Sequence, residues 1–217
     1  MPLLITRDEG ARLLLYATAA AALAAEVVAT YLGQQRSGDR LRVFGGSLLD
    51  ATLLRSRGDT SADRGTKRFL VICVLAGVLS ATYLAKDFPS LRAGANTWPT
   101  LILGIAIAVL GVSLRVWSVR SLGRFFQRDV TVQEGHVVSP AGPYRWLRHP
   151  AYAGNLLSYF GLGLAIGSWV GAFVLLAIAF AGHIPRITVE EAALTRALGD
   201  EYRDYAAATA RLVPGVW

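Results

Sequence analysis

The part of the sequence best equipped for chemistry is a polar, aromatic-rich segment at residues 142–154. It reads Gly-Pro-Tyr-Arg-Trp-Leu-Arg-His-Pro-Ala-Tyr-Ala-Gly and lies between apolar runs. A proline keeps the preceding residue out of helical geometry, so we expect Gly142 and His149 to be extended. Pro150 suits the first turn of a helix. A rigid polar segment is costly at a membrane surface unless it binds a ligand, so we expect it to aim His149 and Tyr152 at the start of a membrane helix.

A second candidate group follows the last apolar run of the sequence. Arg186 and Glu190 are four residues apart, so they share one face of a helix. The ordinary interpretation of such a pair is a surface contact, with Glu191 solvated beside it. Its position directly after a membrane hairpin, at the same surface as residues 142–154, favours a functional role.

The composition indicates an integral membrane protein. Of the 217 residues, 53% are hydrophobic and only 17% are charged, and the mean hydropathy is +0.42. Soluble domains carry about 25% charged residues. The net charge of +7 comes from arginines in the loops between apolar runs, which favours anionic lipid headgroups over nucleic acid as the partner. The single cysteine, Cys73, excludes a disulfide framework, and no metal site is predicted.

The apolar runs predict an all-α protein with about five membrane-spanning helices. The first three runs are residues 11–32, 69–85 and 98–119. The run 151–184 is interrupted at Gly167-Ser168-Trp169, and the sixteen residues before the break rise roughly 24 Å as helix, against a bilayer core of about 30 Å. This predicts a helical hairpin. We expect a tail helix to start at Pro185, and Gly199 to end its first section.

The basic residues predict the orientation in the membrane. The loop 33–68, the segment 120–149 and the tail hold most of the arginines. Positively charged loops face the cytoplasm, so we expect the N-terminus outside and the tail helix inside. Within the first of these loops, residues 41–54 can lie along the surface as an amphipathic helix.

Six short motifs occur in the order and with the spacing of a known family. They are Leu122-Gly-Arg-x-Phe, Glu134-Gly-His, Gly142-Pro-Tyr-Arg, Arg148-His-Pro-x-Tyr-x-Gly, Arg186-x-x-x-Glu-Glu and Gly199-x-x-Tyr-x-x-Tyr. In these motifs the chain resembles the isoprenylcysteine carboxyl methyltransferase family, which shares its membrane fold with phospholipid methyltransferases. The resemblance covers residues 122–214. The chain departs from the family pattern at Val138-Ser139-Pro140 and at Leu198, neither of which carries the expected chemistry.

The resemblance implies an S-adenosylmethionine-dependent methyltransferase whose site faces the cytosol and takes a lipophilic or lipidated acceptor from the bilayer. It implies N-terminal membrane helices with a basic loop at residues 1–120, and a catalytic region at 121–217. Arg186 and Glu190 are the implied catalytic residues. The planar fork of Arg186 suits an acceptor carboxylate, and Glu190 suits the ribose or a cationic part of the cofactor. The implied cofactor-binding residues are His136, Val137, Val138, Gly142, Tyr144, His149, Pro150, Tyr152, Gly154, Glu190 and Glu191.

The residue types agree with this implication. A sulfonium cation is attracted to aromatic faces, which Tyr144 and Tyr152 supply. Gly142 and Gly154 permit a ligand to approach the backbone closely. His183, at the end of the hairpin, is expected to be an interfacial residue without a role in the reaction.

The sequence leaves the methyl acceptor open. A carboxylate is favoured and is already a nucleophile, so positioning and desolvation supply most of the rate. The alternative is a phospholipid or small-molecule amine or thiol; an amine needs a base, for which Glu190 and His149 are the candidates. Two further classes are an NADPH-dependent enzyme resembling sterol reductases, whose chains are generally longer, and a non-catalytic membrane protein, which is expected to lose His149, Arg186 or Glu190.

Overall fold

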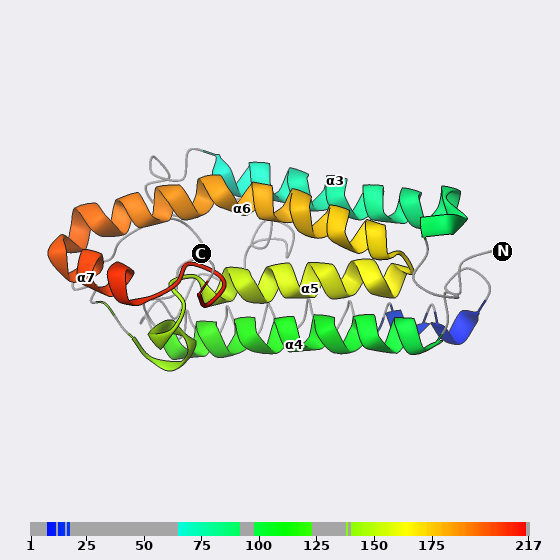
Figure 1. Ribbon diagram of the computed structural model, residues 1–217, viewed down its shortest axis with the longest axis horizontal. Helices are drawn as coiled ribbons and strands as arrows, with labels where there is room; N and C mark the ends of the chain where they lie inside the picture. Colours follow the sequence, from blue (N-terminus) through cyan, green and yellow to red (C-terminus); the bar gives the residue numbers. More distant parts are fainter. Residues whose placement is uncertain are drawn as a thin grey trace, which may run out of the picture.

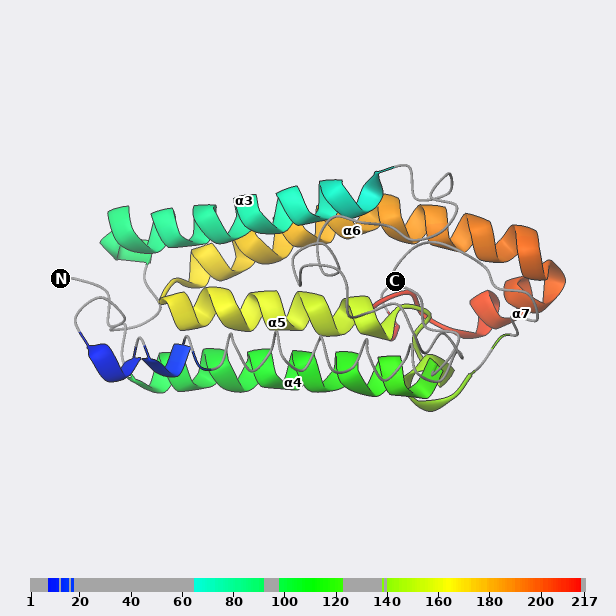
Figure 2. The ribbon, with the colours of Figure 1, turned by 180° about the vertical axis from the view of Figure 1, so that it is seen from behind.

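The computed structural model of the protein describes residues 8–11, 13–15, 17, 65–91, 98–122, 138 and 140–215, and these residues are mainly helical. Four long helices lie side by side in the order α3, α6, α5, α4 (Figure 1), and Figure 2 shows the same order from behind. Their bounds are Thr66–Asp87 for α3, Trp98–Leu122 for α4, Pro150–Ile166 for α5 and Trp169–Leu198 for α6. The short elements are α7 (Asp200–Ala208) and the 3-10 helices η2 (Pro89–Leu91) and η4 (Gly142–Arg145).

Three of the helices are long and apolar enough to cross a membrane: Arg68–Asp87, Trp98–Leu122 and Trp169–Leu198. The first two confirm the helices predicted from the second and third apolar runs. Of the first predicted span, only residues up to position 17 are described, and those from position 9 onward are helical. The predicted surface helix at 41–54 lies outside the described residues. The total of five spans therefore stays a prediction.

The predicted hairpin is confirmed as α5 and α6, joined at the expected break. Gly167 has a φ of 106°, in the left-handed region that glycine adopts without steric cost. Ser168 caps α6, because its Oγ accepts a hydrogen bond from the Gly171 N–H at 3.0 Å. The same hydroxyl donates to the Leu91 carbonyl at 2.8 Å. The turn thereby fastens the hairpin to the end of the α3 region.

Helices α4 and α5 approach each other through glycines. Gly104 and Gly111 of α4 face Gly161 and Gly154 of α5, and a Cβ added at Gly104 would lie 2.4 Å from the Ala165 nitrogen. Small residues allow this close backbone packing between membrane helices. The expectation that Gly154 makes room for a ligand is corrected here, because a Cβ at Gly154 would lie 2.6 Å from the Gly111 carbonyl oxygen. Its missing side chain makes room for α4.

Helix α6 continues through Pro185, which corrects the prediction that a separate tail helix begins there. Its 30 residues span about 45 Å, more than the bilayer core of about 30 Å. A proline inside a membrane helix removes one backbone donor but is tolerated where neighbouring groups satisfy the freed carbonyl. Gly199, with a φ of 58°, ends the helix as predicted and leads directly into α7.

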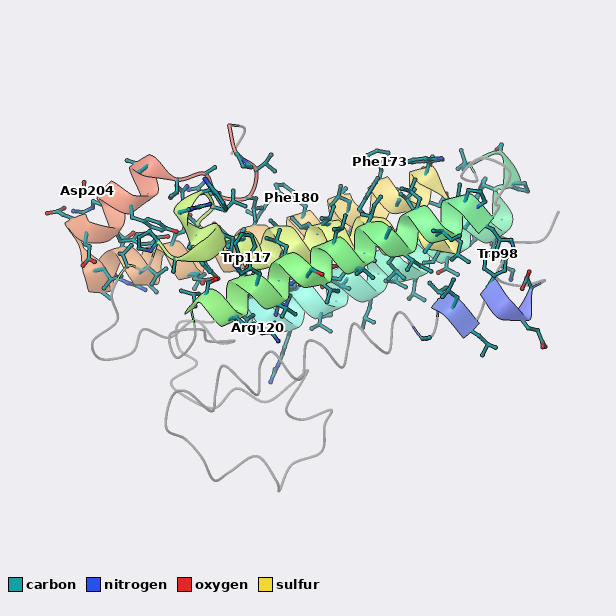
Figure 3. All side chains as sticks on the ribbon, turned by 90° about the horizontal axis from the view of Figure 1, so that it is seen from below. Trp98, Trp117, Arg120, Phe173, Phe180 and Asp204 are labelled. Carbon is teal, nitrogen blue, oxygen red and sulfur yellow. The ribbon has the colours of Figure 1, made fainter. Side chains whose placement is uncertain are left out.

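Tryptophans mark two levels along the helices. Trp98 begins α4 and Trp117 lies near its end, and both side chains are partly exposed. Figure 3 shows Trp98 and Trp117 toward opposite ends of α4. Their separation of 19 positions (117 − 98) corresponds to about 28 Å of helix, which matches the spacing of the two aromatic belts of a membrane protein. The Trp146 ring contacts Trp117 edge-on at 6.4 Å, so η4 and the residues after it lie at one interface.

Candidate active site

The candidate site lies at the end of the bundle where α6 outreaches its neighbours. Three parts of the chain meet there (Figure 1): the segment between η4 and α5, the C-terminal third of α6, and α7 with the chain after it. Residues that are far apart in sequence thus share one small volume at the predicted membrane surface.

The approach to α5 is shaped by Gly142 and Pro150. Gly142 has a φ of 57°, which corrects the expectation that it is extended. A Cβ at this position would lie 2.2 Å from the Ser121 hydroxyl, so a glycine lets the segment turn tightly against the end of α4. His149, with φ −124° and ψ 54°, is not helical but is not extended either, which corrects that expectation. Pro150 starts α5, as predicted.

The Tyr152 hydroxyl joins the two implied catalytic residues. The Arg186 Nε–H donates to the Tyr152 Oη at 3.0 Å, and that hydroxyl donates to Glu190 Oε2 at 2.7 Å. The His149 ring stacks on the Tyr152 ring with centroids 5.5 Å apart and planes 12° apart. Arg186 and His149 are only 6% and 4% exposed, whereas the Glu190 side chain is 31% exposed. Glu190 is therefore the member of this group with a face open to a ligand.

Glu191 has a different environment from its neighbour. Its Oε1 accepts from the Arg148 Nε–H at 2.9 Å and lies 3.2 Å from His149 Nε2. The Arg211 guanidinium reaches Oε1 at 3.2 Å and Oε2 at 3.0 Å. Both carboxylate oxygens are thus engaged, and the side chain is only 14% exposed. The contacts of Glu191 connect α6 to residues 146–149, here named the His149 segment, and to the end of the described chain. Its predicted contact with the cofactor stays a prediction.

Residues 209–212, here named the C-terminal segment, form part of the site, and no motif in the sequence indicates this. They run parallel to the His149 segment. The Arg148 N–H donates to the Ala210 carbonyl at 2.7 Å, and the His149 N–H donates to the Arg211 carbonyl at 3.0 Å. In return the Ala210 N–H donates to the Trp146 carbonyl at 3.1 Å. A lone arginine near the end of a chain carries no recognisable signal, so only the structure reveals this role.

Tyrosine hydroxyls complete the polar side of the site. The Tyr205 hydroxyl donates to the Tyr144 carbonyl at 2.7 Å and lies 3.3 Å from the Leu147 carbonyl. Burial raises the pKa of Tyr205 to about 12, and burial also raises the pKa of Tyr144 well above its ordinary value, because a phenolate is poorly solvated there. Both hydroxyls therefore stay protonated near neutral pH, and that of Tyr205 acts as a donor.

Two buried polar atoms have no hydrogen-bond partner within the described part of the chain: the Tyr202 hydroxyl and His183 Nε2. Burial, and then the negative charges of Glu191 and Glu190, raise the pKa of Tyr202, so its hydroxyl stays protonated. His183 was expected to be interfacial, and this is wrong: it is fully buried. Its ring faces α5, where it meets the Tyr152 ring edge-on at 5.2 Å.

The remaining predicted residues lie at the margin of the site or outside the described chain. The Val138 N–H donates to Glu201 Oε1 at 3.3 Å, so this residue is tied to α7. His136 and Val137 fall outside the described residues. The structure brings together the residues of the other motifs, namely Tyr144, His149, Tyr152, Arg186, Glu190 and Glu191.

Comparisons with known proteins show what the sequence and the fold resemble. The family model "Phospholipid methyltransferase" matches residues 99–201. Protein-S-isoprenylcysteine O-methyltransferase A of Arabidopsis thaliana is 28% identical over 131 residues, which is 59% of this chain and 65% of that protein. A probable protein-S-isoprenylcysteine O-methyltransferase of Oryza sativa subsp. japonica is 25% identical over 170 residues, covering 76% of this chain and 87% of that protein.

A solved structure shares the fold. It is that of the eukaryotic intramembrane Ras methyltransferase, an isoprenylcysteine carboxyl methyltransferase, with a TM-score of 0.57 and 22% sequence identity. The match covers 67% of this chain and 52% of that one, so the chain spans about half the length of the solved protein.

Fold and site together define the class: a helical integral membrane protein with the architecture of the intramembrane methyltransferases. The chain resembles the phospholipid methyltransferase family over residues 99–201 and isoprenylcysteine O-methyltransferases over a longer stretch, and it shares the fold of the solved isoprenylcysteine carboxyl methyltransferase.

Proposed function

We propose that the protein is a membrane methyltransferase that transfers a methyl group from S-adenosylmethionine to a lipophilic carboxylate. The observation that carries this proposal is the buried guanidinium of Arg186, held by the Tyr152 hydroxyl one helical turn from Glu190. A buried arginine is costly at a membrane surface. It is well suited to a planar anion such as a carboxylate, which it can bind through two parallel hydrogen bonds.

The depth of Arg186 supports an acceptor that arrives from the bilayer. Arg186 lies 17 residues after Trp169 (186 − 169), or about 26 Å along α6. With Trp169 at one interface, the guanidinium then lies close to the other edge of the hydrocarbon core. A lipid-borne carboxylate is held by its chain at this same level.

The residues of the site fit S-adenosylmethionine, which supplies an electrophilic methyl group on a sulfonium when bound. The Tyr202 hydroxyl is buried without a partner within the described chain, as expected of a donor reserved for a polar ligand. Glu190 presents a partly exposed carboxylate, which suits a cationic or hydroxylated part of the cofactor. The stacked rings of His149 and Tyr152 offer aromatic faces to a cation. His149 and Tyr152 thus form one wall of the proposed site, and Glu191 holds this wall in place through its contacts with Arg148 and Arg211.

The chain's own groups have simple tasks in such a reaction. Arg186 orients the acceptor carboxylate, and Tyr152 fixes the Arg186 side chain by accepting its Nε–H. The carboxylate is already deprotonated, so no residue has to remove a proton. The rate then depends on alignment of the reactants and on exclusion of water, and burial of Arg186 and His149 serves the second requirement.

The loop charges support a further part of the proposal, namely five spans with the site on the cytosolic side. Residues 121–217 carry the chemistry, and residues 1–120 provide the N-terminal membrane helices and the basic loop. The glycine contacts between α4 and α5 give the catalytic region a rigid support from the first part.

The proposal is tested first by cofactor binding. Isothermal calorimetry in detergent is expected to show binding of S-adenosylmethionine but not of NADPH, and weaker binding by His149→Ala and Tyr152→Ala at unchanged thermal stability. Unchanged affinity in both variants would refute the site assignment. Transfer of a labelled methyl group to lipid extracts, with the products identified by mass, then tests the acceptor. A labelled ester supports the carboxylate proposal.

A phospholipid amine is the second candidate acceptor. It is favoured by the family model, whose description names phospholipid methyltransferases. Methylation of an amine requires removal of a proton, and the partly exposed Glu190 is the group placed for that task. A label that mild alkaline hydrolysis does not release as methanol, and that mass identifies on an amine headgroup, would indicate this outcome in the same screen.

A further inference from the structure

His183 has an unusual hydrogen-bonding state for a residue in the middle of a membrane helix. Its Nδ1 lies 2.7 Å from the Ala179 carbonyl oxygen. A carbonyl only accepts hydrogen bonds, so Nδ1 carries the proton. A ring that is fully buried in a membrane-spanning helix is favoured in its neutral form. Nε2 is therefore an unprotonated acceptor, and it has no donor within the described chain.

This acceptor lies next to the proposed carboxylate clamp. His183 precedes Arg186 by three residues on α6, so the two side chains are neighbours on one helical face. Tyr152 contacts both: its ring is 5.2 Å from the His183 ring, and its hydroxyl is 3.0 Å from Arg186 Nε. The Tyr159 ring lies 6.4 Å from His183 on the other side. Because the sequence runs toward the proposed surface, His183 lies one turn deeper in the membrane than Arg186.

We propose that His183 is a specificity-determining residue of the acceptor site. Its Nε2 accepts a hydrogen bond from an N–H or O–H group carried on the carbon next to the acceptor carboxylate, while Arg186 holds the carboxylate itself. This inference rests on the proposed function, because it takes the acceptor to be a carboxylate bound at Arg186. Tyr152 keeps its hydrogen bonds to Arg186 and Glu190; Tyr159 is only partly buried, and rotation of its ring is the route by which the proposal brings such a group to Nε2.

The other nearby bases do not offer an equivalent acceptor. His149 Nε2 is directed at Glu191, and Glu190 Oε2 already accepts from Tyr152. A buried acceptor without a donor destabilises a protein, and it persists where a ligand completes it. A plain fatty or isoprenoid acid would leave Nε2 unsatisfied. A site built to hydrogen-bond a substrate group rejects the analogue that lacks this group.

The test uses two acids that differ in one atom. One is a lipophilic N-acyl amino acid, and the other is its ester analogue, in which an oxygen replaces the amide N–H. The wild-type protein, saturated with S-adenosylmethionine, is expected to prefer the amide in kcat/KM by roughly 2- to 10-fold, the equivalent of one hydrogen bond. His183→Phe keeps an aromatic side chain but removes both ring nitrogens, Nε2 among them, and is expected to abolish the preference.

Thr188→Val is the matched control. Thr188 lies on α6, and its hydroxyl bonds to the carbonyl four residues earlier, but the side chain faces outward. This variant is expected to keep the wild-type preference. Thermal unfolding is the check on folding: the change of preference in His183→Phe counts as evidence for the role of Nε2 only when the variant unfolds cooperatively, because the change also removes the Nδ1 hydrogen bond to Ala179.

The outcomes separate this inference from the function on which it rests. Equal kcat/KM for the two acids in the wild type, or an unchanged preference in His183→Phe, overturns the role of His183. Calorimetric binding of the two acids reports the preference without turnover. If neither acid is methylated but the wild type still binds the amide more tightly, and His183→Phe does not, the carboxylate reaction is refuted while the role of His183 stands.

Discussion

The contact between Arg211 and Glu191 offers a direct test of how the site is held together. Replacing Arg211 by Gln removes the guanidinium but leaves the backbone, including the hydrogen bond from the His149 N–H to the carbonyl of residue 211. Glu191 then keeps its contacts with Arg148 and His149. We expect the variant to fold. The segment that carries His149 is expected to be less well ordered than in the wild type.

The size of the effect follows from exposure. Arg211 reaches both oxygens of Glu191 at 3.0 to 3.2 Å, and a hydrogen bond to a charged group contributes about 1.5–3 kcal/mol when desolvated. The Arg211 side chain is 36% exposed and Glu191 14%, so solvent screening lowers this toward the value of a surface pair. We therefore expect a loss of about 1–2 kcal/mol, equivalent to a factor of roughly 5–30 in the population of the ordered segment.

Cofactor affinity is the appropriate measurement, because the ordered segment forms one wall of the proposed site. Calorimetry with S-adenosylmethionine is expected to show 5- to 30-fold weaker binding by Arg211→Gln, with partial recovery in Arg211→Lys, which lacks the two-pronged geometry. Arg203→Gln is the control, since Arg203 pairs with Asp200 on the exposed side of α7 and such pairs contribute little. If Arg211→Gln and Arg203→Gln bind the cofactor equally well, the C-terminal segment does not support the site.

Three further predictions concern the clamp, the helix contact and the topology. Arg186→Lys is expected to lower turnover and kcat/KM for a carboxylate acceptor together, whereas Glu190→Gln is expected to weaken cofactor binding; full turnover by Arg186→Lys would exclude the clamp. Gly161→Leu forces α4 and α5 apart, because even a Cβ would lie 2.4 Å from a backbone nitrogen of α4. This variant is expected to lower the midpoint of thermal unfolding. Its control, Ala106→Leu on the exposed face of α4, is expected to leave the midpoint unchanged. A cysteine introduced at Gly58, with the native cysteine replaced, is expected to react with impermeant reagents from the cytosolic side, and labelling only from outside would contradict the orientation.

The helical elements were predictable because helices that cross a membrane consist of long runs of apolar residues. The apolar runs gave the positions of α3 and α4, and Gly167 and Ser168 marked the hairpin. The boundary at Pro185 was wrong because a proline usually ends a helix in water, whereas neighbouring groups in a membrane protein satisfy the carbonyl that it frees. Gly142 was misjudged for a related reason: the contact with Ser121, which requires a left-handed residue, is invisible in sequence.

The site was only partly predictable because motifs identify residues but not their partners. The Arg186 and Glu190 spacing correctly indicated a shared face, yet the connecting hydroxyl of Tyr152 depends on how α5 packs against α6. Adjacent glutamates look equivalent in sequence, and only the structure distinguishes Glu191, bound on both oxygens, from Glu190. The burial of His183 could not be predicted either, because its direction depends on the rotation of α6 about its axis.

The length of α6 ties the proposed chemistry to the lipid that surrounds the protein. Trp169 and Arg186 are separated by about 26 Å of helix, and Trp98 and Trp117 by about 28 Å. In a bilayer with longer acyl chains, hydrophobic mismatch draws Arg186 below the headgroups unless the bundle tilts, and the glycine-packed pair of α4 and α5 has to tilt as one body. An acceptor carboxylate stays at the headgroup level in either case. Acyl-chain length thereby sets how well the guanidinium and its substrate coincide in depth, so the membrane itself becomes a regulator of turnover.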